Sequence, residues 1–165
     1  MNQSDLLQEL ALQREIEQFV YREARLQDSH DYDAWEALWT DDGIYWVPAN
    51  GDDIDPESQM SIIYDNRSRI ALRIKQLHTG KRHTQIPPSR LCRVVSNVEL
   101  LARGDGEYKV GANALIFESN ARGDTLWAAR NEYLLRRSEQ GLRMARKKVM
   151  LTNNDKPLYT LSFLI

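Results

Sequence analysis

The first 28 residues show the spacing of hydrophobic positions that is typical of an amphipathic helix. In the stretch LLQELALQREIEQFVYREARLQD, Leu12, Ile16, Phe19 and Val20 recur at intervals of three and four, with charged side chains between them. This period places the apolar residues on one face of a helix. The pattern predicts a long helix that packs against a core on one side.

A second helix is predicted directly after the first one. Asp33 is followed three residues later by Glu36, which is a capping-box pattern, and Gly43 provides a stop signal. Between these signals, Trp35 and Trp39 fall on one face of a helix. We expect this helix to anchor itself to the rest of the fold through these aromatic side chains.

Two short strands and a third helix are predicted next. The stretches IYWVPA and SIIYD have the composition of strands, and a proline ends the first of them. In the following stretch Asp65 or Asn66 can cap a helix, Ile70 and Ile74 share a face, and Gly80 closes the pattern. The acidic segment between the two strands is predicted to be a loop.

From residue 90 onward the pattern changes to long β-rich runs. The runs LCRVVSNVELLA, YKVGANALIFES, LWAARNEYLLRR and LRMARKKVMLT are separated by the turn signals RGDGE, NARGDT and SEQG. Runs of this length predict a strongly bent antiparallel sheet, in which Gly111 marks a bend or bulge. The apolar tail KPLYTLSFLI is expected to dock on the domain or on a neighbouring chain.

Helices followed by an antiparallel meander indicate an α+β fold, because a βαβ alternation is absent from the pattern. A long curved sheet must cover its concave face, and the N-terminal helices are the available elements. The sequence therefore predicts one domain over residues 1–165, a cone-shaped half-barrel with the helices packed into a strongly curved, mostly antiparallel sheet. Five residues are assigned structural roles in it: Trp35, Tyr45, Pro87, Pro88 and Asn97.

Composition narrows the function classes only slightly. The 165 residues are 42% hydrophobic and 28% charged with a net charge of −2, so no nucleic-acid or membrane partner is expected. A membrane span and a secretory signal are not recognisable, which predicts a cytoplasmic protein. The single cysteine, Cys92, excludes an internal disulfide and is expected to be a small buried apolar side chain.

Two kinds of catalytic site deserve consideration, although phosphate-binding and nucleophile-elbow motifs are absent. His78 and His83, together with a carboxylate, resemble part of a two-histidine iron site, but they lie in the segment with the least predicted structure. A cone also has a natural cavity, in which Tyr21, Asp28 and His30, with Tyr45, form a candidate set for acid/base chemistry.

The chain resembles the β (small) subunit of aromatic-ring-hydroxylating dioxygenases over nearly its whole length. The matching stretches, in order, are VYREARLQD, YDAWEALWTDDGIYWVPA, SIIYDNRSRIALRI, PPSRLCRVVSNVEL and the closing ARKKVML and PLYTLSFLI. The resemblance implies a cone of the NTF2-like (cystatin-like) type and a non-catalytic chain. It implies a catalytic α subunit that carries a Rieske [2Fe-2S] cluster and a mononuclear Fe(II), in an α3β3 complex supplied with NADH-derived electrons by a reductase.

Under this resemblance, arginines on or beside the strands become candidates for contacts with α or with other β subunits, because arginine can bind carboxylates in a bidentate way. The candidates are Arg90, Arg93, Arg130, Arg136 and Arg137. Two alternatives stay open. One is a stand-alone isomerase or dehydratase of the same fold that uses the acid/base set, and the other is a homo-oligomeric binding protein.

Overall fold

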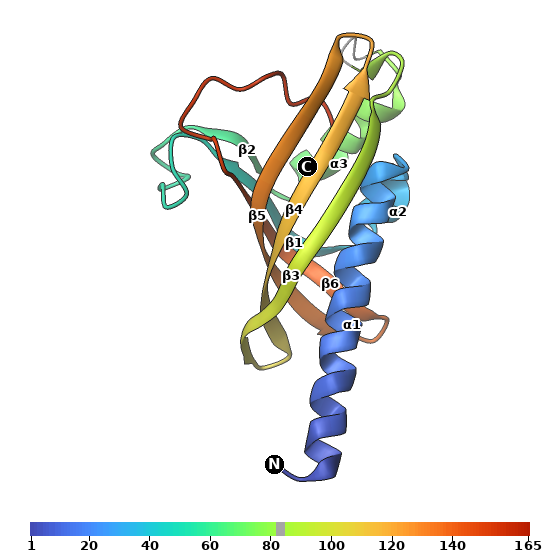
Figure 1. The fold of residues 1–165 in the computed structure, drawn as a ribbon, viewed down its shortest axis with the longest axis vertical. Helices are drawn as coiled ribbons and strands as arrows, with labels where there is room; N and C mark the ends of the chain where they lie inside the picture. Colours follow the sequence, from blue (N-terminus) through green and yellow to red (C-terminus); the bar gives the residue numbers. More distant parts are fainter. Residues whose placement is uncertain (82–84) are drawn as a thin grey trace.

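The amphipathic pattern of the first 28 residues forms one long helix, α1, which begins at a capping box between Asn2 and Asp5. The computed structural model describes residues 1–81 and 85–165. The elements, drawn in Figure 1, are α1 (Gln3–Asp28), α2 (Tyr32–Glu36), β1 (Trp39–Pro48), β2 (Ser61–Asp65), α3 (Arg67–His78), β3 (Arg90–Gly104), β4 (Glu107–Asn120), β5 (Gly123–Ser138) and β6 (Gly141–Leu151).

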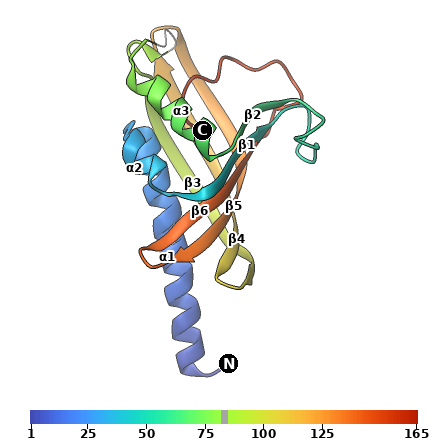
Figure 2. The same ribbon diagram turned by 180° about the vertical axis from the view of Figure 1, so that it is seen from behind.

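The six strands form one curved sheet in the order β2-β1-β6-β5-β4-β3. All neighbours pair antiparallel except β1 and β6, which are parallel. The helix α1 packs along β3 at one edge, and its first turns project beyond the sheet (Figure 1). Figure 2 shows from behind how β1 and β2 extend the sheet beyond β6, with α3 beside them. The predicted α+β class and the curved, mostly antiparallel sheet are thereby confirmed.

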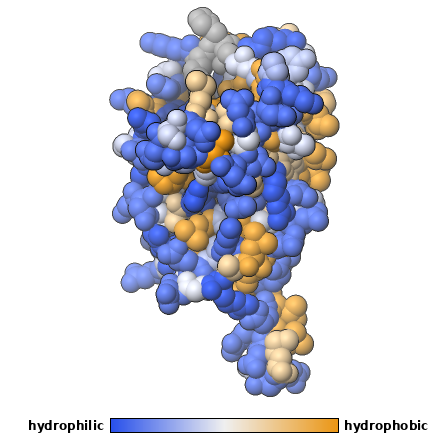
Figure 3. Space-filling model, turned by 90° about the vertical axis from the view of Figure 1, so that its left-hand side faces the viewer, coloured by the Kyte–Doolittle hydropathy of each residue, from blue (hydrophilic) through white to orange (hydrophobic). Residues whose placement is uncertain are grey.

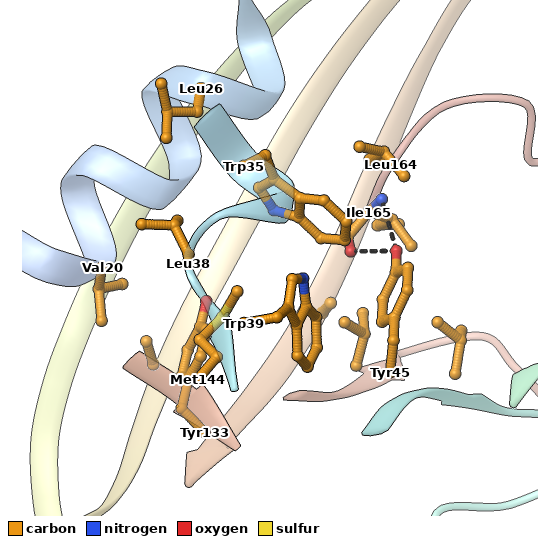
Figure 4. Close-up of a cluster of buried hydrophobic side chains, with 14 of the residues drawn as sticks. Val20, Leu26, Trp35, Leu38, Trp39, Tyr45, Tyr133, Met144, Leu164 and Ile165 are labelled. Carbon is orange, nitrogen blue, oxygen red and sulfur yellow. Dashed lines mark hydrogen bonds between the residues drawn. The ribbon is translucent and has the colours of Figure 1, made fainter. Parts of the chain in front are cut away.

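The hydrophobic core lies between the helices and the face of the sheet that they cover, which we call the inner face. At its centre, the rings of Trp35, Trp39 and Tyr45 contact one another with centroids 5.5–5.9 Å apart. Leu164 and Ile165 of the tail are buried beside them (Figure 4). The tail therefore docks on its own domain, one of the two arrangements expected from its apolar sequence. In the described residues, no helix is long and apolar enough to cross a membrane.

The prediction for the second helix is wrong at both ends. The helix is capped by Asp31, ends at Glu36, and gives way to β1, so Trp39 begins a strand and Gly43 lies inside it. Pairing of Trp39 with Met144 on β6 overrides the local helical pattern. Gly43 is required for packing instead, because a Cβ there would lie 2.7 Å from the Trp39 ring.

The prediction that Cys92 is buried is also wrong. Cys92 is exposed, because alternate residues of β3 face away from α1. The irregularity expected at Gly111 lies across from it, in β3, where Asn97 has a φ of 53° and the register with β4 shifts. Gly111 itself makes room for the Arg130 guanidinium, since a Cβ would lie 2.3 Å from Arg130 Nη2.

Candidate functional site

A buried ion pair crosses the inside of the cone, where the sequence suggested a cavity. Lys147 Nζ on β6 lies 2.7 Å from Glu23 Oε1 on α1, and both side chains are at most 2% exposed. The indole of Trp35 donates a hydrogen bond to the same carboxylate oxygen, at 3.0 Å. Burial lowers the pKa of Lys147, while the negative charge of Glu23 opposes that shift. This pair joins α1 to the sheet through groups that have no access to solvent.

The ion pair continues into a hydrogen-bond network that holds the tail. Gln27 accepts from Lys147 Nζ at 3.5 Å and donates to the Leu164 carbonyl at 3.2 Å. The Tyr45 hydroxyl donates to the Ile165 carbonyl at 2.6 Å and accepts from the Ile165 amide at 2.9 Å (Figure 4). The tail thus occupies the space beside the aromatic cluster that a bound small molecule would need.

The two buried tyrosines of the inner face are poorly suited to proton transfer near neutral pH. Tyr45 and Tyr133 are 0% and 2% exposed, and burial raises the pKa of both phenols above the usual 10.0. Each phenol therefore stays protonated far into the alkaline range while the protein is folded.

This shift predicts a loss of stability above pH 10. In the unfolded chain the two phenols ionise near pH 10, whereas the folded protein keeps both protons, so the folded state binds more protons. The free energy of unfolding should fall by about 1.4 kcal/mol per pH unit for each tyrosine. Urea titrations between pH 8 and pH 11 measure the slope, and Tyr45→Phe or Tyr133→Phe should each remove one part of it. An unchanged slope in both variants would contradict the assignment.

The predicted acid/base residues Tyr21, Asp28 and His30 lie in three different environments. The Tyr21 side chain lies on the exposed side of α1, at 39% exposure. Asp28 forms an ion pair with Arg93 and also accepts from the Arg93 amide at 2.9 Å. The His30 ring bonds the Ser89 carbonyl through Nε2 at 2.7 Å. Asp28 and His30 therefore tie α1 to β3 and its entry loop, and Tyr21 does not join them in a cavity.

The histidine pair that resembled an iron site is only half described. His78 Nε2 lies 2.7 Å from Asp33 Oδ1 in an exposed contact between α3 and α2. His83 lies outside the described residues. Within residues 1–81 and 85–165, no three His, Cys, Asp or Glu side chains gather in a way that could hold a metal ion.

The opposite, outer face of the sheet exposes a continuous group of apolar side chains, which we call the outer patch. The register places Cys92, Phe117 and Leu126 in one row across three strands, and Val94 beside Leu115 in the next row. Four of these residues are 48–66% exposed: Val94, Leu115, Phe117 and Leu126. A group of this kind on one sheet face is typical of a contact surface. Sequence reasoning missed it, because β3 carries apolar residues on both of its faces.

The five predicted interface arginines divide between the two faces. Arg90 and Arg130 lie one row beyond either end of the outer patch, on the same face. Arg90 is exposed and pairs with no side chain in the described part of the chain. Arg130 Nη1 donates to Asn113 Oδ1 at 3.2 Å, and its Nη2 lies 3.8 Å from Glu99 Oε1.

The other three arginines are held within the chain. Arg136 pairs with Asp42 at 2.8 Å on the outer side of β5. Arg137 makes a two-pronged contact with Glu15 of α1, and Arg93, which is 3% exposed, is held between Asp28 and the tail. Arg93 faces inward because it shares its side of β3 with the residues that pack on α1.

Pro87, Pro88 and Asn97, for which structural roles are predicted, lie in the segment before β3 and in β3 itself. Pro87 and Pro88 are exposed in the segment that leads into β3, and the bond between Ile86 and Pro87 is cis. Asn97 sits at the irregularity of β3, where an asparagine tolerates the positive φ. Their structural roles stay predictions.

A second exposed apolar surface lies at the projecting end of α1. Leu6, Leu7 and Leu10 are 45%, 59% and 57% exposed, and we call them the leucine end. Figure 3 shows apolar surface at the narrow end of the molecule. The three leucines are three or four residues apart or adjacent, so they lie together on one face of α1.

Comparison with known proteins identifies the family to which this chain belongs. The sequence model of a family described as "Ring hydroxylating beta subunit" matches residues 22–155. The chain belongs to this family. The small subunit of anthranilate 1,2-dioxygenase from Acinetobacter baylyi is 32% identical over 152 residues, which cover 88% of this chain and 92% of that subunit. The β subunit of toluate 1,2-dioxygenase from Pseudomonas putida is 36% identical over 103 residues, 59% of this chain and 64% of that subunit.

Solved structures of ring-hydroxylating β subunits share the fold. The β subunit of benzoate 1,2-dioxygenase from Burkholderia mallei superposes with a TM-score of 0.72 at 26% identity, and the match covers 84% of this chain and 89% of that one. An NTF2-like protein with a cystatin-like fold from Novosphingobium aromaticivorans has a TM-score of 0.62 at 21% identity, with coverage of 92% and 91%. The predicted cone of the NTF2-like type is thus confirmed, and the relatives are subunits of oxidoreductase complexes.

Proposed function

We propose that this chain is the non-catalytic small subunit of a cytoplasmic aromatic-ring-hydroxylating dioxygenase. Its partner is a catalytic α subunit, and the complex has the composition α3β3. The reaction adds dioxygen to an aromatic ring with electrons that come from NADH through a reductase. The chain's contribution is to stabilise and shape the complex.

The observation that carries this proposal is the contrast between the two faces of the sheet. On the inner face, aromatic rings, the Glu23–Lys147 pair and the docked tail fill the space in which an enzyme of this fold would need a substrate cavity. On the outer face, apolar side chains that a monomer would be expected to cover are left exposed. A protein with a packed interior and an exposed apolar face is suited to assembly.

The donor atoms of the chain support placing the cofactors in the partner. A Rieske cluster requires two cysteines and two histidines, and this chain has the single cysteine Cys92. Of the three histidines, His30 and His78 are engaged with Ser89 and Asp33. The single cysteine does not fit a Rieske cluster, and within residues 1–81 and 85–165 no side chains gather that could hold the mononuclear iron, so we assign both centres to the α subunit.

We propose the outer patch, with Arg90 and Arg130 at its ends, as the main contact surface. An apolar centre flanked by arginine is a common composition of protein interfaces. Among the five arginines, Arg90 is the strongest candidate for a contact with a partner, because it is exposed and its side chain makes no hydrogen bond or ion pair in the described part of the chain. Arg93, Arg136 and Arg137 contribute indirectly, by fixing β3 and β5 on their intrachain carboxylates. The leucine end is a second contact surface.

Co-expression with candidate Rieske-type α subunits tests the proposal. The expected result is a complex with three copies of each chain, with iron in it and NADH-dependent oxidation of an aromatic ring when the reductase is added. Native mass spectrometry gives the composition, and metal analysis of each separated chain gives the location of iron. If the chain stays apart from every α subunit tested, or alone turns over a small substrate, the proposal fails. The second result would favour the isomerase or dehydratase alternative.

A further inference from the structure

A hollow on the outer face, away from the outer patch, is a candidate ligand-binding site. It encloses about 400 Å³ between β4, β5, β6 and the acidic loop after β1. This volume lies within the range of small-molecule sites in proteins. Its lining side chains include three cations, two carboxylates and one leucine: Lys109, Arg146, Lys148, Asp53, Glu132 and Leu134.

Two of the cations share one aromatic ring. Lys148 Nζ lies 4.5 Å and the Arg146 guanidinium carbon 5.1 Å from the centre of the Trp46 ring. Trp46 is itself 4% exposed and fixed by a hydrogen bond from its Nε1 to Ser61 Oγ at 2.9 Å. Trp46 therefore holds two like charges near each other, and an anion bound between them would relieve their repulsion.

The carboxylates of the hollow do not balance these charges. Glu132 lies 3.5 Å from Lys109. Lys148 is 12% exposed, and its one ion pair, with Asp53 at 3.9 Å, is with a carboxylate that is fully exposed to solvent. Within the described residues, Arg146 pairs with no carboxylate. The three cations and two carboxylates leave a net charge of one positive unit. This charge is carried by the Arg146 guanidinium, whose planar geometry suits it to bind a carboxylate.

We infer that this hollow binds a small monocarboxylate with an apolar or aromatic body. The carboxylate lies between Arg146 and Lys148, and the body rests against Leu134. A single uncompensated charge matches a monoanion, whereas a phosphate dianion would be repelled by Asp53 and Glu132. The inference goes beyond the proposed function, because it concerns this chain alone and requires no partner.

Titration of the isolated chain with sodium benzoate at constant ionic strength tests the inference. The readout is the emission of Trp46, which lies under the two cations, and benzamide and inorganic phosphate serve as probes that lack the carboxylate. Benzoate should give a saturable change that the other two do not. A Trp46→Phe variant should lose this signal, while ligand-observed NMR still detects the bound benzoate.

Three substitutions make the test specific. Arg146→Gln and Lys148→Gln should each weaken benzoate binding by about tenfold or more, the loss expected for one charge-assisted hydrogen bond. Asp53→Asn should tighten binding severalfold, because it removes a competing carboxylate from a fully exposed position. The matched control is Arg22→Gln on the exposed side of α1, which should bind like the unmodified chain.

Three results would overturn the inference. The first is the absence of a saturable benzoate response, and the second is a response that survives in Arg146→Gln and Lys148→Gln variants whose thermal unfolding is unchanged. Both are separable from a failure of the proposed function, since assembly with the α subunit is measured in a different experiment. Equal binding of benzamide would show that the apolar wall alone is used, and would likewise exclude a carboxylate site.

Discussion

Replacing Glu23 with alanine is expected to lower the free energy of unfolding by about 3–5 kcal/mol, which is the usual cost of stranding one partner of a buried ion pair. Lys147 would remain 1% exposed with no anion, and the Trp35 indole would lose its acceptor. Urea denaturation followed by circular dichroism measures the change. This is the largest effect that we expect from any single substitution in the chain.

The matched control for this prediction is the double variant Glu23→Leu with Lys147→Met. It removes both charges and keeps the volume, and such replacements are often neutral or stabilising. A double variant that is as unstable as Glu23→Ala would indicate that lost packing or the unsatisfied Trp35 indole, and not an unpaired charge, causes the destabilisation. Breaking an exposed pair such as Arg103 with Glu9 should leave the free energy of unfolding almost unchanged, because solvent screens both charges.

Introducing charge into the outer patch is expected to abolish assembly while leaving the fold intact. The double variant Val94→Glu with Leu126→Glu places two carboxylates where the side chains are 61% and 66% exposed. Such exposed positions should change the free energy of unfolding by no more than about 0.5 kcal/mol each. Affinity for the α subunit should fall by about 100-fold or more, because two central contacts of about 2 kcal/mol are lost.

Sedimentation of the mixed chains measures this effect, and Leu72→Glu on α3 is the control. Leu72 is 54% exposed but belongs to neither contact surface, so its variant should assemble normally. Arg90→Glu should weaken assembly by a smaller factor than the double variant. If the patch variant assembles as well as the unmodified chain, the outer patch is not the contact surface, although the small-subunit role could still hold through the leucine end.

Most of the fold could be predicted from local pattern, because α1, α3 and the four long strands each extend over many repeats of their own period. The boundary between α2 and β1 could not. Trp39 follows a helical pattern locally, and its true partner, Met144, lies more than a hundred residues later in the chain. Pairing at such separation leaves no trace in a window of ten to twenty residues.

The outer patch was harder to predict than the fold, because β3 is apolar on both of its faces. Val95 and Val98 pack toward α1, while Cys92 and Val94 face outward, so alternation does not say which set is the core. Arg93 was expected among outward arginines for the same reason. The Asp28 that binds it is found only when α1 is placed against β3, which the sequence of neither element specifies.

The parallel pairing of β1 with β6 has a consequence for synthesis of the protein on the ribosome. The strands β3 to β6 join through tight turns and can form as they emerge, but β1 gains its central neighbour only when residues 141–151 have been made. Until then Trp39 and Tyr45 have no sheet to cover them. A nascent chain interrupted before β6 therefore exposes its aromatic core to chaperones and proteases, and only chains that have completed β6 are available to a partner.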